Sequence, residues 1–129
     1  MNTLTSMRED VVNALKAEDL KAVEYVQENI VPPVCVVVPA NPYITTPDGN
    51  TFGNQYSVGM HVLVIGAKGT NKTAATKIDS MVVDVVNALD DDWDITEVTA
   101  PQEMTLKGIS YIGAVVTLET NTKLEKEVI

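Results

Sequence analysis

The most regular strand pattern in this chain reads Tyr56-Ser57-Val58-Gly59-Met60-His61-Val62-Leu63-Val64-Ile65. Alternate residues of a strand point to opposite faces, and one face here begins at Tyr56 and is otherwise apolar. The other face is polar at its start, with Ser57 and His61, and apolar at its end, with Leu63 and Ile65. We predict that the first face is core and that the second is covered along only part of its length.

A second apolar tract, Val34–Val38, precedes this strand, and the two tracts flank a long irregular segment, Ala40–Gln55. Pro39 and Pro42 are predicted to end the first tract, because proline donates no hydrogen bond to a sheet. Irregular segments of this length in a small domain commonly bind a partner or a ligand. We therefore predict a partner-contact loop here. Its candidate contact residues are Tyr43, Ile44, Asp48 and Phe52.

Two segments have the period of amphipathic helices, and the first covers residues 3–17. Its apolar stripe consists of Leu4, Met7, Val11, Ala14 and Leu15. Ser6 and Glu9 have the spacing of a capping box, whereas Leu4 in the stripe indicates an earlier start at Asn2 or Thr3. The second helix is predicted over Asn71–Leu89. Its apolar ridge is formed by Ile78, Val82, Val85 and Leu89.

Three further strands are predicted: a short edge strand over 22–26, one over 93–99 with an extension past Pro101 to Leu106, and one over 109–118. Lys107-Gly108 supplies the turn before the last strand, which is apolar on both faces. Cover on both faces is therefore expected, part of it from a neighbouring copy. The predicted fold is α+β, with a mixed or antiparallel sheet of about four to five strands flanked by two helices. Residues 1–118 form one domain, and 119–129 a polar C-terminal tail that is expected to be loose.

Composition narrows the classes of function. The 129 residues are 45 % apolar, enough for a single folded domain. The net charge of −9 argues against gripping nucleic acid from outside, because such affinity comes from lysine and arginine on phosphates. This negative charge remains compatible with a protein wall past which DNA slides without binding. The N-terminal residues lack the pattern of a signal peptide and no apolar run reaches membrane-spanning length, so a soluble cytoplasmic product is expected.

The residues that could carry chemistry are few. Cys35 and His61 are the only cysteine and histidine, so a disulfide within the chain and a four-ligand zinc site are excluded. We interpret Cys35 as a buried small hydrophobe and His61 as a hydrogen-bonded or interface residue. The run Asp90-Asp91-Asp92 is interpreted as a solvated helix end rather than a metal site. No enzymatic activity and no cofactor are predicted.

One segment approaches a phosphate-binding loop: Gly66-Ala67-Lys68-Gly69-Thr70-Asn71-Lys72-Thr73. It follows a strand and opens a helix, as such loops do. Asn71 stands where the pattern requires its second glycine, and the nearest acidic partner, Asp84, is predicted on a helix rather than at a strand end. We interpret the segment as a polar turn, and a small nucleotide-binding enzyme is the contrasting hypothesis.

Several tracts together resemble the tail terminator, or tail completion, proteins of long-tailed bacteriophages. The tracts are Val31–Pro39 with Pro42-Tyr43-Ile44, Tyr56–Val64, the helix around Ile78–Leu89, Val98–Pro101, and Gly108–Val116. They span nearly the whole chain. They consist of apolar strands and prolines and include no catalytic signature.

The resemblance implies a structural subunit of a hexameric ring at the head-proximal end of the tail tube. Such a ring stops tube polymerisation and forms the docking surface for the head and neck. Its partners would be copies of itself, the tail tube protein and a neck or connector protein, and DNA would pass through its lumen without specific binding. The protein would be assembled in the host cytoplasm and reside in the virion, without contact with a membrane. Another neck component, such as a head-closure or head-tail connector protein, is the neighbouring alternative.

Overall fold

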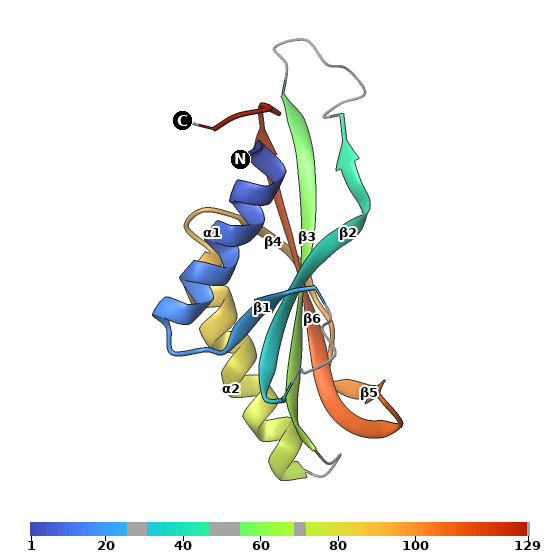
Figure 1. Cartoon of the computed structure of the whole chain (residues 1–129). Helices are drawn as coiled ribbons and strands as arrows, with labels where there is room; N and C mark the ends of the chain where they lie inside the picture. The colour runs from blue at the N-terminus through green and yellow to red at the C-terminus, as the bar shows by residue number, and fades with distance from the viewer. Residues whose placement is uncertain (26–30, 47–54, 69–71, 129) are drawn as a thin grey trace.

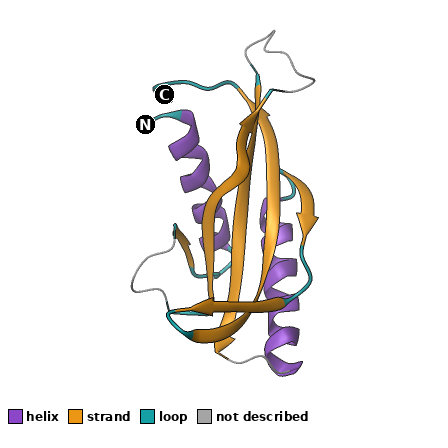
Figure 2. Ribbon diagram, turned by 90° about the vertical axis from the view of Figure 1, so that its right-hand side faces the viewer, coloured by secondary structure: helices purple, strands orange, loops and turns teal. Residues whose placement is uncertain are grey.

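Two helices pack on one face of a mixed sheet (Figures 1 and 2). The computed structural model describes residues 1–25, 31–46, 55–68 and 72–128. The helices are α1 (Thr3–Ala17) and α2 (Lys72–Leu89). The strands are β1 (Ala22–Glu24), β2 (Val34–Thr45), β3 (Tyr56–Lys68), β4 (Asp94–Val98), β5 (Gln102–Leu106) and β6 (Ile109–Thr122). The predicted α+β class is confirmed, with six strands among the described residues instead of four to five.

The sheet is built around the long central strands β3 and β6. The order is β1-β2-β3-β6-β4, with β5 also paired to β6. Only the β1–β2 pair is parallel among these pairings of the described strands. The strands β4 and β5 pair with opposite ends of β6, so the strand predicted to continue past Pro101 is instead two strands. Proline at that position has no N–H to continue a ladder.

The main core lies between the sheet and the two helices. Its sheet side includes the cross-strand rows Cys35, Val64 and Ala114, and Val37, Val62 and Val116. Its helix side includes Val11 and Leu15 of α1 and Ile78, Val85 and Leu89 of α2. All of these side chains are buried, which confirms the predicted helical stripes and the predicted core face of β3.

Helix α1 begins where the apolar stripe, rather than the capping box, predicts. Asn2 is the N-cap, and its Oδ1 accepts a hydrogen bond from the backbone N–H of Thr5 at 2.9 Å. Ser6 and Glu9 lie inside the helix, and the backbone N–H of Ser6 is already bonded to the carbonyl of Asn2. The short strand β1 ends at Glu24, and Val26, the last residue of the predicted strand, lies outside the described residues.

The helix-free face is covered over half of its length by the hairpin of β5 and β6. In Figure 2 the two strands cross in front of the sheet at its lower end. Met104, Leu106 and Tyr111 pack there against a buried cluster of Val34, Val36 and Ile65. This arrangement confirms the predicted partial cover of β3, and at this end the cover comes from the chain itself rather than from a neighbouring copy.

Two glycines allow the hairpin to form and to approach the sheet. The predicted turn at Lys107-Gly108 is confirmed, with φ of 50° and 77° in the left-handed region that tight hairpin turns require. A Cβ on Gly113 would lie 2.6 Å from Sδ of Met104 and 2.8 Å from the carbonyl oxygen of Val64. The hairpin therefore packs at a distance that only a glycine at 113 permits.

The predicted end of the first apolar tract is wrong, because β2 continues through both prolines to Thr45. Pro39 is still paired with Met60, and pairing resumes at Ile44 with Val58 after an irregularity. Within the described residues, β1 pairs with β2 only over Cys35–Val37, so the outer edge of β2 beyond that point requires no N–H donors. The irregular segment is correspondingly shorter than predicted, and residues 47–54 of it lie outside the described chain.

The predicted domain boundary at Leu118 and the loose tail are also wrong. Residues 119–122 continue β6, and the chain then runs beside the start of α1, where both termini lie close together in Figure 1. The N–H of Thr3 donates to the carbonyl of Glu125 at 3.0 Å, and the N–H of Glu125 donates to Oγ1 of Thr3 at 2.7 Å. Leu124 packs against the main core. This segment therefore includes the end of a strand and a stretch that packs beside α1, although its composition is polar.

Candidate interaction surface

Two of the four candidate contact residues of the predicted loop lie within the described chain. Tyr43 and Ile44 belong to β2, whereas Asp48 and Phe52 lie outside the described residues. Ile44 is 37 % exposed and pairs with Val58. Tyr43 is half-buried against the main core, so its ring already has a place within the subunit. Of the described pair, Ile44 is the residue with surface available to a partner.

Tyr43 is held by Arg8, a residue that the sequence reading did not single out. Nη1 of Arg8 donates to the hydroxyl of Tyr43 at 3.2 Å, and the guanidinium lies 4.8 Å from the ring centre of Tyr25. Nε of Arg8 is 3.9 Å from a carboxylate oxygen of Glu24 and makes no hydrogen bond to a described residue. Arg8 is 9 % exposed. It thus joins α1 to β1 and to the distal part of β2.

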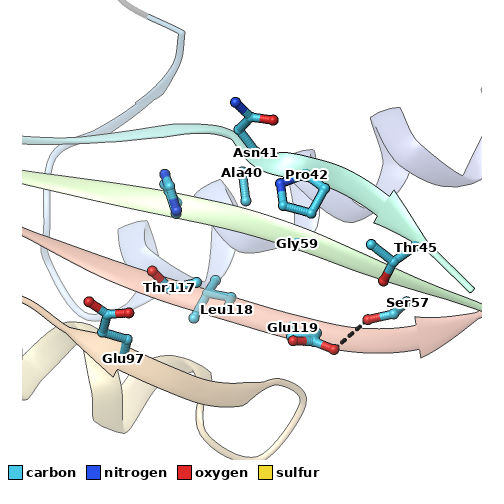
Figure 3. A pocket seen from close by; sticks show the side chains of 11 residues that line it. Ala40, Asn41, Pro42, Thr45, Ser57, Gly59, Glu97, Thr117, Leu118 and Glu119 are labelled. Atoms are coloured by element: carbon cyan, nitrogen blue, oxygen red, sulfur yellow. Dashed lines mark hydrogen bonds between the residues drawn. The ribbon is translucent and has the colours of Figure 1, made fainter. Parts of the chain in front are cut away.

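The other half of the helix-free face, which no described segment covers, forms a hollow of about 330 Å³ (Figure 3). Its floor is made by β3 and β6, through Ser57, Gly59, His61 and Thr117 among others. One wall is the irregular part of β2 at Ala40–Pro42, and the opposite wall carries Glu97 of β4. The polar start of the second face of β3, noted in the sequence, is therefore the floor of an open hollow.

Close approach of β2 shapes this hollow. A Cβ on Gly59 would lie 3.0 Å from the Cβ of Ala40 and 3.4 Å from the carbonyl oxygen of Pro42. The irregularity between Pro39 and Ile44 thus brings the backbone of β2 over the floor at Gly59. A side chain at 59 would push this wall away.

The charged side chains of the hollow are acidic. Glu97 and Glu119 both line it, and Figure 3 shows them on the two neighbouring strands β4 and β6. Oγ of Ser57 donates to Oε1 of Glu119 at 2.5 Å. Asp94 is paired directly with Glu119 across the two strands, so it shares this face. Among the described residues, no lysine or arginine lines the hollow.

Cys35 and His61 are on opposite faces of the sheet. Cys35 belongs to the helix-side core, is fully buried, and is a free thiol. Burial raises the pKa of this thiol to about 12. His61 pairs with Val38 and Thr117 on the helix-free face and lines the hollow. The imidazole cannot serve as the base for this thiol, and the interpretation of Cys35 as a buried small hydrophobe is confirmed.

The segment that approaches a phosphate-binding loop is divided among different elements. Gly66 to Lys68 belong to β3, residues 69–71 lie outside the described chain, and Lys72 and Thr73 begin α2. A Cβ on Gly66 would lie 2.9 Å from Cδ1 of Ile78, so this glycine permits close packing of α2 on the sheet. Asp84 is exposed on α2 and does not lie at a strand end.

Two further observations concern metal binding and membrane-spanning helices. Asp90, Asp91 and Asp92 are exposed after α2, and within the described ranges no group of three or more histidine, cysteine, aspartate or glutamate side chains is arranged to hold a metal ion. No helix in the part of the chain that the structure describes has the length and apolar character needed to cross a membrane.

Comparison with known proteins does not assign the chain to a family. No protein-family model matches the sequence, and no curated protein matches it at a significant level. The geometry of the surface and the resemblance of the strand tracts are therefore the basis for a functional hypothesis.

Proposed function

We propose that this protein is a structural tail terminator, a ring-forming subunit that caps the head-proximal end of a phage tail tube. In this role it stops tube polymerisation and forms the docking surface for the head and neck. The ring is proposed to be a hexamer, with DNA passing through its lumen without specific binding. The protein resides in the virion, is assembled in the host cytoplasm, and acts without enzymatic activity or a cofactor.

One observation carries this proposal: the described residues leave half of one sheet face open. Both helices cover the same face, and the hairpin of β5 and β6 covers only one end of the other (Figures 1 and 2). A sheet face with a shaped hollow is a surface that a partner or a further copy can cover. The joined end of β2 and β3, where Ile44 is exposed, lies beside this open half.

Charge and core composition support an assembly role over an enzymatic one. The net charge of −9 favours a ring lumen to which DNA phosphates do not adhere. The buried thiol and the close packing of Gly66 against Ile78 give no support to a nucleophile or to a phosphate cradle at these positions. The proposed ring would form by heterologous contacts, in which one surface of a subunit binds a different surface of the next. Such contacts give a closed ring when the rotations between neighbours add up to a full turn.

The direct test is tube growth. Purified tail tube protein is polymerised with and without this protein, and tube lengths are measured by electron microscopy. We expect short tubes with a ring at one end. Tubes of unrestricted length would contradict the proposal, and binding to filled heads without an effect on tubes would identify the alternative, another neck component.

A loop variant refines this test. Residues 47–54 are replaced by a short glycine linker that joins Thr46 to Gln55. We expect a protein that still folds, because the variant keeps every residue of the core described above, and a loss of tube capping. The matched control is Val83→Ser on the exposed side of α2, where the side chain is 56 % exposed. Normal capping by the loop variant would remove the proposed role of the loop.

A further inference from the structure

We propose that the open half of the helix-free sheet face docks an extended basic segment of a partner protein, whose lysine or arginine side chains reach Glu97 and Glu119. In its choice of partner, the tail tube subunit, this inference rests on the proposed function. The site itself is argued from the shape and charge of the described residues.

The shape of the hollow fits an extended chain. Its floor is the surface of β3 and β6, and its walls are the backbone of β2 at Ala40–Pro42 and the edge strand β4. Neighbouring strands are spaced by about 4.8 Å, so the two walls stand roughly three spacings apart. The other end of the same face already packs against an extended segment of this chain, the strand β5. At the open end, no described segment covers the same floor strands in this way.

The charge of the hollow selects a basic occupant. Glu97 and Glu119 contribute carboxylates to it, and among the described residues no lysine or arginine lines it. Charge complementarity between surfaces steers association and excludes partners of like charge. A segment with lysine or arginine at alternate positions would place all of its basic side chains on the face that meets this floor.

The acidic pairing across β4 and β6 is unfavourable in the isolated subunit. Asp94 and Glu119 occupy directly opposite positions, and like charges at such positions destabilise a sheet. Oε1 of Glu119 accepts the hydrogen bond from Ser57. A basic side chain in the hollow would relieve the repulsion. Local arrangements that weaken a fold are characteristic of surfaces kept for binding.

The test uses the full-length isotope-labelled protein and a short peptide that alternates lysine with threonine. Backbone amide shifts are followed by NMR during the titration, with a glutamate–threonine peptide as the reversed-charge control. We expect shifts centred on residues 57–61, 94–97 and 117–119. Because the whole protein is acidic, shifts spread over all acidic surfaces would overturn the proposal by indicating unspecific attraction.

A pair of charge-matched variants sharpens the result. Glu97→Gln with Glu119→Gln removes two charges from the hollow, and Asp79→Asn with Asp84→Asn removes two exposed charges from α2. The first variant retains an acceptor for Ser57 and loses the repulsion with Asp94, so it is expected to be at least as stable as the parent. We expect peptide affinity to fall roughly threefold to tenfold in the first variant and to be nearly unchanged in the second. Equal losses in both would overturn the proposal.

The same variants separate this inference from the proposed function. If the parent protein caps tubes and the Glu97→Gln, Glu119→Gln variant caps them equally well at every salt concentration, the docking inference fails and the tail terminator function stands. If the parent protein does not cap tubes but the peptide maps to the hollow, the function fails and the site stands. A third result, in which the variant gains affinity for double-stranded DNA at this face without losing the peptide, would identify a lumen wall and overturn the docking inference.

Discussion

Arg8 on α1 donates a hydrogen bond from Nη1 to the hydroxyl of Tyr43 on β2 at 3.2 Å, and this contact links the helical layer to the far end of the sheet. Beyond Val37, β2 has no strand on its outer side within the described residues, and the contact with Arg8 helps to hold this end in place. Residues 47–54, which belong to the predicted contact loop Ala40–Gln55, follow the end of β2 in the sequence. Arg8, which is far from this segment in sequence, therefore supports the strand that leads into it.

Tyr43→Phe is expected to lower the free energy of unfolding by about 1–3 kcal/mol, because it removes an acceptor from a buried guanidinium. Denaturant unfolding measures this loss. Arg8→Met is the companion variant. It should lower the free energy of unfolding by less than Tyr43→Phe does, because it removes the buried charge instead of leaving that charge with fewer partners. A double variant that loses as much as the two single losses combined would show that the pair is not coupled.

Cys35 gives a prediction for alkaline pH. Burial raises the pKa of its thiol from 9.0 to about 12, so between these values the unfolded chain binds fewer protons than the folded chain. The contribution is fully present below pH 9.0, and above it the free energy of unfolding should fall by about 1.4 kcal/mol per pH unit, until the folded thiol also ionises near pH 12.

The measurement is the stability of the parent protein and of Cys35→Ala across this range. Other groups titrate here too, so the prediction concerns the difference in slope between the two proteins. The variant should start lower, because a buried side chain is shortened, and then decline less steeply. Parallel slopes would mean that the thiol is accessible in the folded state.

The C-terminal segment is predicted to be held mainly by Thr3. Thr3→Val keeps the side-chain shape but removes the acceptor for the N–H of Glu125, which should cost about 1 kcal/mol and speed hydrogen exchange of that amide. Glu127→Gln is the control. The ion pair of Glu127 with the N-terminal amine is exposed on both sides, so its loss should leave exchange at Glu125 unchanged. Faster exchange in the control would assign the docking to charge instead.

Gly113→Ala is predicted to loosen the hairpin that covers the sheet. The added Cβ would meet the backbone oxygen of Val64 at 2.8 Å, and overpacking of this kind costs about 1–3 kcal/mol. Gly66→Ala is the comparison, because its closest neighbour is the terminal carbon of the Ile78 side chain, which can shift. We expect unfolding midpoints to fall further for Gly113→Ala. The opposite order would show that the hairpin can move away at little cost.

The spacing of apolar residues along the sequence predicted most of the helices and strands correctly. Helix α1, the start of β3, helix α2 and the turn at Lys107-Gly108 all lie where apolar spacing or turn chemistry places them. These features are local, since each depends on residues within one or two turns of the chain. The two-sided pattern of β3 also predicted correctly that one end of its second face is covered.

The two strand ends that the sequence predicts wrongly, those of β2 and β6, depend on which strands lie beside them in the sheet. A proline ends a strand in the centre of a sheet but not a strand whose outer edge has no neighbour. That Pro39 is in the second situation is visible only in the pairing of β1 with β2. The polar end of β6 pairs with β3, although its composition predicts a tail, because polar residues carry no hydrophobic signal. Arg8 could have been found, since it lies four residues after Leu4 and three before Val11 and so shares the apolar stripe.

The hollow itself could not be predicted from the sequence. Its acidic residues Glu97 and Glu119 come from strands that meet only in the folded sheet, and the strand pattern around Glu97 is interrupted by a register shift. Its wall at Ala40–Pro42 falls in the segment that was predicted to be irregular. Only the polar residues Ser57 and His61 at the start of β3 indicated an open surface there.

Native mass spectrometry of the purified protein, recorded over increasing concentration with and without short tail tubes, tests most directly whether the open sheet face serves assembly. The proposed tail terminator should appear as a hexamer, either free in solution or on tube ends to which the monomer has bound. A protein that stays monomeric at every concentration and shows no affinity for tube ends would contradict the proposal.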